Sequence, residues 1–295
     1  MAVRAAQPSP FDVTATGPGA EAAARICTVA GKLQRRMRGW AVEFPAPYDP
    51  RSFDPGLYSM LALAAAFSDP HRTVDQLQPA GRMSLWVLGL GRRVAHLASE
   101  PELWRLIEHY EAVADGASPD PDDDLSRFLA VIHRELAALP AHPVLYDAWQ
   151  EELRRTLRAL ARSWTTARAG RRPSFEEYLR DADGFGLALT FAAHRIATGD
   201  SGPAEDLADA ARAVQRAVRL SADLGAAGRG LDPGEPNALT LGLPRPAVEL
   251  RLAEATGQAR TLLAAARARH REQADYMERH MDFYAGFFGT APPRR

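Results

Sequence analysis

The sequence has very little cysteine, lysine and net charge, and each shortage excludes a class of protein. Cys27 is the only cysteine among 295 residues, which rules out an intrachain disulfide and a cluster of thiolate metal ligands. Lys32 is the only lysine, so arginine supplies nearly all the positive charge. The formal net charge is −1, from 36 basic and 37 acidic residues. We therefore expect no nucleic-acid partner and no attraction to an anionic membrane surface.

Long apolar runs and alternating strand patterns are missing as well. No run of about 18 apolar residues occurs, so we expect no membrane span. The first residues lack the apolar stretch of a secretory signal, so a reducing cytoplasm is the expected location. Residues 1–18 are rich in Pro, Gly, Ser and Thr and are predicted to be disordered. Residues 19–290 are predicted to form one α-helical domain.

Apolar residues recur with helical spacing along the rest of the chain. The spacing predicts helices over 20–39, 55–67, 73–98, 101–115, 123–138, 143–169, 174–198, 203–229, 246–269 and 270–288. The segments 57–67 and 185–197 are apolar around most of their circumference, which is typical of helices buried on several sides. Such helices either surround an apolar pocket or pack into a solid core, and the pattern alone leaves both open.

Four stretches resemble a known family. They are GWAVEFPAPYDP at 39–50, the proline-to-tryptophan stretch 70–90, the helix start SFEEYL at 174–179, and RLSADL with GEPNAL at 219–239. Together they resemble bacterial class I terpene synthases over residues 40–288, and the last run is similar to ent-kaurene-type diterpene synthases. The resemblance implies an all-α, single-domain bundle of helices around an apolar pocket. It also implies a prenyl diphosphate or terpenoid substrate, and a homodimer is an open alternative.

The family's metal ligands are absent from the matching positions. The resemblance implies three Mg²⁺ ions held by an aspartate-rich motif and an Asn/Ser/Glu motif, because hard cations prefer oxygen ligands. An arginine that senses the diphosphate completes the family site. Here the matching residues are Gly91, Arg92 and Ala95 in the first motif, Ala222, Ala226 and Gly230 in the second, and Ala182 for the arginine. Magnesium is the cofactor expected for the family, but we expect no metal site in this chain.

Basic residues stand where the family has acid. Arg92 and Arg93 could bind a diphosphate directly, with His96 on the same helical face. The alternative is that the two arginines face solvent or pair with a surface acid such as Glu102, and that His96 is structural. Arg180, beside the sensor position, and Arg229, which matches the basic residue of the second motif, are further candidates for substrate binding.

Three aspartates are candidate catalytic acids. Asp181 and Asp183 occur where the family's helix breaks toward its pocket, and Asp223 occurs in the second motif. A carboxyl in an apolar cavity has a raised pKa and can donate a proton, which would start a cyclisation without metal. The alternative is that each of the three is solvated or caps a helix.

The remaining candidates are aromatic residues and glycines. Trp86, Phe185, Phe191 and Tyr284 could line a pocket around a cation, or they could be ordinary core residues. Gly89 and Gly91 could allow a close helix contact or leave open space.

Three functions remain open at this point. The first is an atypical terpene cyclase that works without the usual metal motifs. The second is a catalytically silent homologue that binds an isoprenoid or accompanies an active synthase. The third is a helical scaffold protein.

Overall fold

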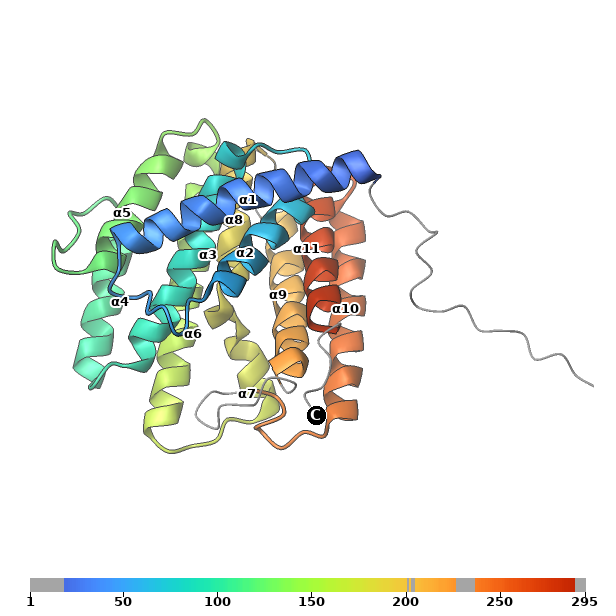
Figure 1. Ribbon diagram of the computed structural model, residues 1–295. Coiled ribbons are helices and arrows are strands. Elements are labelled where there is room, and N and C mark those ends of the chain that lie inside the picture. Colours follow the sequence, from blue (N-terminus) through green and yellow to red (C-terminus); the bar gives the residue numbers. More distant parts are fainter. Residues whose placement is uncertain (1–18, 201, 203–204, 227–236, 290–295) are drawn as a thin grey trace, which may run out of the picture.

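The computed structural model describes residues 19–200, 202, 205–226 and 237–289, and every regular element in these ranges is a helix (Figure 1). The elements are α1 (Ala20–Glu43), α2 (Pro55–Ser68), α3 (Val74–Ala95), α4 (Glu100–Ala114), α5 (Asp124–Ala137), α6 (His142–Arg168), α7 (Phe175–Arg180), the 3-10 helix η1 (Asp181–Phe185), α8 (Leu187–Thr198), α9 (Glu205–Ala226), α10 (Arg245–Ala266) and α11 (Arg271–Gly289). The predicted all-α class is confirmed. The predicted disordered segment 1–18 lies outside the described residues.

Side-chain caps begin several of these helices where the sequence predicts a start. Thr73 forms a capping box with Gln76 at α3, and Ser174 forms one with Glu177 at α7. Asp54 and Asp123 cap α2 and α5 by accepting from backbone N–H groups of the first turn. These bonds satisfy donors that have no partner within the helix, which explains why the predicted boundaries agree closely with the structure.

One predicted helix is wrong. The segment 174–198 does not form one helix but divides into α7, η1 and α8. The division falls at Gly186, whose φ of 67° lies in the left-handed region that glycine adopts most readily. A Cβ atom at this position would lie 2.4 Å from Cγ1 of Val87, so the missing side chain also lets the start of α8 approach α3 closely.

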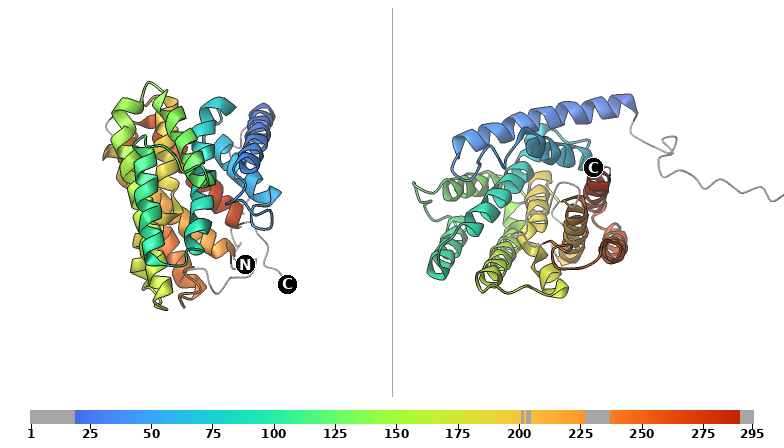
Figure 2. Two further views of the ribbon diagram at one scale, coloured as in Figure 1. Left: turned by 90° about the vertical axis from the view of Figure 1, so that its left-hand side faces the viewer. Right: turned by 60° about the horizontal axis from the view of Figure 1, so that its bottom comes forward.

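Helix α8 lies at the centre of the molecule. Leu189, Ala193 and Ile196 pack into a core built mainly by α1 to α6. Leu187 and Phe191 face the other way, into a second core shared with α9, α10 and α11. The prediction that 185–197 is buried on several sides is therefore confirmed. Helix α1 crosses over α2 and α3, and α10 lies on the outside of α9 and α11 (Figure 2).

Two side chains on facing helices lie fully inside the bundle. Trp86 of α3 and Leu189 of α8 have no exposed surface, so no water-sized void adjoins these two side chains. Two hollows lie at the surface of the described residues. One is at the ends of α8 and α11, and the other is between α1 and the start of α3. An apolar pocket and a solid core both remain predictions for the rest of the bundle.

Candidate functional site

Asp181 and Asp183 lie in η1, the short turn between α7 and α8. Because η1 packs against both α6 and α9, residues of these two long helices surround the carboxylates. Nε of Arg162 on α6 donates to Oδ1 of Asp181 at 2.7 Å. Nε2 of Gln215 on α9 donates to Oδ1 of Asp183 at 3.0 Å. The first acid therefore sits in an ion pair, whereas the second receives a hydrogen bond from a neutral amide.

Asp183 has the electrostatic setting of a proton donor. Burial raises the pKa of its carboxyl above the usual range, although four nearby guanidiniums act in the opposite direction. We call these four residues the arginine cluster; they are Arg155 and Arg162 of α6 and Arg212 and Arg216 of α9. A carboxyl with a raised pKa keeps its proton to higher pH, which a general acid requires.

Sequence reasoning missed a buried ion pair beside Asp183. Nη1 of Arg212 donates to Oε1 of Glu152 at 2.6 Å, and its Nη2 donates to Asp209 at 2.7 Å. Burial raises the pKa of the Glu152 carboxyl, and the charge of Asp183 raises it further. A signal was available in the sequence, since Glu152 falls on the same face of α6 as the apolar Trp149 and Leu153.

Asp223 joins α9 to the other side of α7. The hydroxyl of Tyr178 donates to Oδ2 of Asp223 at 2.6 Å, and the backbone N–H of Ala238 donates to the same oxygen at 3.0 Å. Nε of Arg219 lies 3.5 Å from Oδ1. Burial raises the pKa of the Asp223 carboxyl, although these three contacts lower it. The contacts with Tyr178 and Ala238 join α9 to other segments, whereas Arg219 lies on α9 itself.

Two more of the predicted residues lie beside η1. Arg180 is largely exposed, with Nε 3.8 Å from Oδ1 of Asp181. Phe185 is half-buried, and the guanidinium of Arg219 lies 5.8 Å from the centre of its ring. The predicted Arg229 lies outside the described residues. The structure thus gathers Asp181, Asp183, Asp223, Arg180 and Phe185 around η1, in what we call the α6–η1–α9 site.

Arg92, Arg93 and His96 lie elsewhere, at the end of α3. Arg92 bonds to the hydroxyl of Ser52 and lies 3.6 Å from Asp49, whereas Arg93 lies 3.8 Å from Glu102. His96 is exposed, and its Nδ1 lies 2.8 Å from the carbonyl oxygen of Arg92. Among the described residues, these contacts are with a surface loop and with α4, and none is with the three predicted acids.

The other three aromatic candidates are core residues in this structure. Nε1 of Trp86 donates to the carbonyl oxygen of Leu125 at 2.9 Å. The ring of Phe191 packs edge-on against Tyr276 and His280 of α11, with centroids 5.4 and 5.2 Å away. Burial raises the pKa of the Tyr284 hydroxyl. None of the three side chains lines either of the two surface hollows.

Comparison with known proteins gives a consistent answer. Residues 95–236 match the family model described as terpene synthase family 2, C-terminal metal binding. This match covers just under half of the chain. No curated protein matches the chain, so the remaining likenesses are to solved structures.

Two enzymes from Streptomyces share the fold. Linalool/nerolidol synthase of Streptomyces clavuligerus, solved with 2-fluorogeranyl diphosphate, is 15% identical with a TM-score of 0.72, covering 89% of this chain and 94% of the enzyme. 2-Methylisoborneol synthase of Streptomyces coelicolor A3(2), solved with Mg²⁺ and geranyl-S-thiolodiphosphate, is 15% identical with a TM-score of 0.68, covering 88% and 91%. At this identity, the likeness establishes the fold alone.

The positions that match the family's metal motifs do not fit Mg²⁺. Gly91, Arg92 and Ala95 on α3 and Ala222 and Ala226 on α9 offer no side-chain carboxylate, amide or hydroxyl oxygen, and these are the ligands that Mg²⁺ takes from side chains. Among the residues that the structure describes, no group of three or more His, Cys, Asp and Glu is placed to hold a metal ion.

The two candidate glycines on α3 have different surroundings. A Cβ atom on Gly89 would lie within 3.1 Å of Pro47, Tyr48 and Leu125, so this glycine allows a close contact. A Cβ on Gly91 would meet nothing within 4 Å, so this position is open. Of the two predicted alternatives, the close contact thus applies to Gly89 and the open space applies to Gly91.

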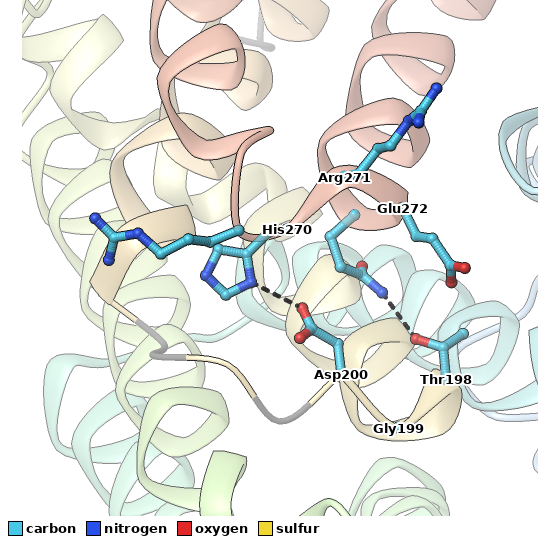
Figure 3. Close-up of a pocket in the computed structure, with 8 residues that line it drawn as sticks. Thr198, Gly199, Asp200, His270, Arg271 and Glu272 are labelled. Atoms are coloured by element: carbon cyan, nitrogen blue, oxygen red, sulfur yellow. Dashed lines mark hydrogen bonds and ion pairs between the residues drawn. The ribbon is translucent and has the colours of Figure 1, made fainter.

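A second polar group lies at one surface hollow, of about 250 Å³. Figure 3 shows Asp200 and Thr198 facing residues at the start of α11. Nδ1 of His270 lies 3.3 Å from Oδ2 of Asp200, and Nε2 of Gln273 donates to Thr198 Oγ1 at 2.8 Å. Oε1 of Gln273 in turn lies 3.3 Å from Nδ1 of the buried His194. These polar groups bond to one another within the protein. The residues that line the hollow have no excess of positive or negative charge.

No helix within the described ranges combines the length and apolarity that a membrane span needs.

Proposed function

We propose that this terpene synthase relative is an atypical terpene cyclase that acts on a prenyl diphosphate or terpenoid at the α6–η1–α9 site. The family match and the fold support a role like that of a terpene cyclase. The observation that carries the finer proposal is Asp183, a carboxyl of raised pKa within the arginine cluster. Asp183 supplies a proton donor in a chain whose positions matching the family's two metal-binding motifs have no oxygen ligands.

The proposed step is a proton transfer from Asp183 to a carbon–carbon double bond of the substrate. The π electrons of that bond form the new C–H bond, which leaves a carbocation and the Asp183 carboxylate. Gln215 holds Oδ1 of Asp183, so Oδ2 is the oxygen that carries the proton. The arginine cluster stabilises the carboxylate that remains, and a later loss of a proton from the cation restores neutral Asp183.

The second candidate is a catalytically silent homologue that binds an isoprenoid or accompanies an active synthase. The burial of Trp86 and Leu189 favours it, because no water-sized void adjoins either side chain and a cation cascade needs a dry apolar space large enough for the substrate chain. The scaffold hypothesis has no specific observation in its favour.

Incubation with C10 to C20 prenyl diphosphates, with and without Mg²⁺ and EDTA, followed by GC–MS, separates the candidates. Already-cyclised diterpene diphosphates belong in the panel because of the likeness to ent-kaurene-type synthases. We expect product that survives EDTA and falls at least about 100-fold in Asp183→Asn, the size of effect for a lost general acid. Glu176→Gln, the same charge change on an exposed residue of α7, should keep full activity.

Product only with Mg²⁺, or unchanged activity in Asp183→Asn, would contradict the proposed acid. No product under any condition favours the silent homologue. The cytoplasmic location, the single domain over 19–290 and a homodimer remain predictions.

A further inference from the structure

Helix α8 begins without a side chain of its own to cap it. Its N-cap residue is Gly186, which forms no side-chain hydrogen bond. The first N–H groups of a helix have no partner within the helix, so a buried one needs an acceptor from another segment. The backbone N–H of the buried Ala188 donates to Oε1 of Gln215 on α9 at 3.0 Å. Gln215 therefore caps α8 from the neighbouring helix.

The same side chain also reaches the proposed proton donor. Nε2 of Gln215 donates to Oδ1 of Asp183 at 3.0 Å. Gln215 is only 1% exposed, so bulk water does not compete for its amide, whereas Asp183 is half-buried. One buried amide thus joins α9 to η1 and to the start of α8.

The backbone holds the two partners of Gln215 on one continuous turn. The N–H of Gly186 donates to the carbonyl oxygen of Asp183 at 3.0 Å, which closes η1. The N–H of Thr190 donates to the carbonyl oxygen of Gly186 at 3.1 Å, which continues the chain into α8. Asp183 and Ala188 therefore face Gln215 from a short stretch whose own hydrogen bonds fix its shape.

These bonds leave the Gln215 amide one orientation. The Ala188 N–H can only donate, so the amide atom that faces it must be the oxygen, and the NH₂ group must then face Asp183. An amide NH₂ group donates and does not accept, so Oδ1 of Asp183 must accept whether the carboxyl is charged or neutral. The proton of a neutral Asp183 is then confined to Oδ2.

We propose that Gln215 is a positioning residue of the α6–η1–α9 site, and that the Ala188 N–H locks its amide so that it cannot accept the Asp183 proton. The inference rests on the proposed function, in which Asp183 is the acid, and adds the residue that keeps this acid available. If the amide were turned by 180°, its oxygen would face Asp183 and accept the proton that the substrate needs. The start of α8 prevents this, since its N–H would then face the NH₂ group and lose its acceptor.

The test is a ¹³C NMR titration of the aspartate carboxyl groups, in which Asp183→Asn identifies the Asp183 signal. Gln215→Leu keeps a side chain of similar size without a donor for Asp183 or an acceptor for Ala188. A hydrogen bond donated to a carboxylate favours its charged form, so we expect a higher pKa for Asp183 in Gln215→Leu than in wild type. The Ala188 amide should exchange with solvent at least about tenfold faster.

The variant Gln215→Glu provides a conservative rescue. While protonated, the introduced carboxyl can accept from Ala188 and donate to Asp183, as the amide does. Once ionised, it has no proton to donate and disfavours the charged form of Asp183. In the GC–MS assay we expect Gln215→Leu to lower kcat at least about tenfold with KM unchanged. Gln215→Glu should approach the wild-type kcat only at a pH where the introduced carboxyl is protonated.

Gln273→Leu is the matched control, because Gln273 is a buried glutamine of α11 whose amide bonds to Thr198 rather than to Asp183. It should leave the Asp183 titration as in wild type. The inference is overturned if Gln215→Leu leaves the Asp183 titration unchanged, or if Gln273→Leu shifts it equally. Circular dichroism shows which variants are folded, and Gln215→Glu carries the titration test if Gln215→Leu is not.

The inference and the proposed function fail separately. The titration and the exchange measurement need no turnover, so they test the Gln215 amide even if the wild-type chain forms no product. Absence of product would remove the proposed function and leave the locked amide in place. Product that is lost in Asp183→Asn but kept in full in Gln215→Leu would retain the proposed function and remove Gln215 as a positioning residue.

Discussion

His280 lies inside the bundle, between Ser68 of α2 and Phe191 of α8. Its Nδ1 lies 2.9 Å from Oγ of Ser68, and its Nε2 has no hydrogen-bond partner among the described residues. Burial, with a smaller effect from His194, lowers the pKa of this imidazole to about 3. The ring therefore stays neutral in the folded chain at the pH where an unfolded histidine takes up a proton.

This residue should make stability depend on pH in a defined window. Below about pH 6.5 the unfolded chain binds a proton at His280 that the folded chain does not bind, so the free energy of unfolding falls as the pH drops toward 3. We expect His280→Asn, whose amide can keep the bond to Ser68, to lack this slope. Between pH 7 and pH 5.5, wild type should lose about 1 kcal/mol more than the variant in urea unfolding.

The control is His96→Asn, since His96 is exposed at the end of α3. It should show the same pH slope as wild type. If the His280 variant also keeps the wild-type slope, the ring is not held neutral in the folded chain.

At the scale of elements, α7 contacts α9 through Tyr178, whose hydroxyl also accepts from Nε of Arg219. Tyr178 of α7 donates to Asp223 of α9 at 2.6 Å, and both side chains are buried. A six-residue helix contributes little stability of its own, so this bond should help to fix its position. We expect a double-mutant cycle of Tyr178→Phe and Asp223→Asn in urea unfolding to give a coupling of about 1–2 kcal/mol.

A matched cycle serves as the control for that coupling. Tyr146→Phe removes a hydroxyl that donates to the carbonyl oxygen of Ala114, which is unconnected to Asp223. Its effect should add to that of Asp223→Asn within about 0.5 kcal/mol. A Tyr178 cycle that is equally additive would mean that the contact does not join the two helices.

The predictable part of the fold consists of elements with a local cause. Capping residues such as Thr73 and Asp123 act within one turn, so the sequence alone predicts helix starts close to those observed. The break at Gly186 was missed because the apolar pattern continues across it, although two glycines at 184 and 186 were a signal. The choice between a pocket and a solid core could not be made from the sequence, because it depends on how closely α8 approaches α3, which no local pattern encodes.

The candidate site also has residues that the sequence could predict and residues that it could not. Asp181, Asp183 and Asp223 could be found by matching motifs, because those positions are defined along the chain. Arg155 and Arg216 could not, since arginines spaced along one helix resemble an ordinary solvated face. Only the packing of α6 against η1 and α9 brings their charges toward Asp183. The sequence does have an arginine at position 92, where the family has an acid. In the structure, the Arg92 side chain contacts Ser52 and Asp49.

For the whole molecule, the decisive property is its response to metal. A ligand that binds only the folded chain at 100 times its Kd adds about 2.7 kcal/mol of stability and raises Tm by several degrees. The positions at 91, 92, 95, 222 and 226 have no oxygen ligands, so 5 mM Mg²⁺ should leave Tm within about 1 °C of its value in EDTA. Differential scanning fluorimetry measures Tm in Mg²⁺ and in EDTA.

Adding diphosphate makes that prediction stricter. A site that assembles through metal ions would show its largest rise in Tm with Mg²⁺ and diphosphate together. If the proposed cyclase takes the diphosphate group without a metal ion, the full rise should appear in EDTA and a smaller one with Mg²⁺, because the metal competes with the protein for the same oxygens. A rise in Tm that requires Mg²⁺ would mean that other residues replace the ligands of the two metal-binding motifs. It would contradict a metal-free site at α6, η1 and α9.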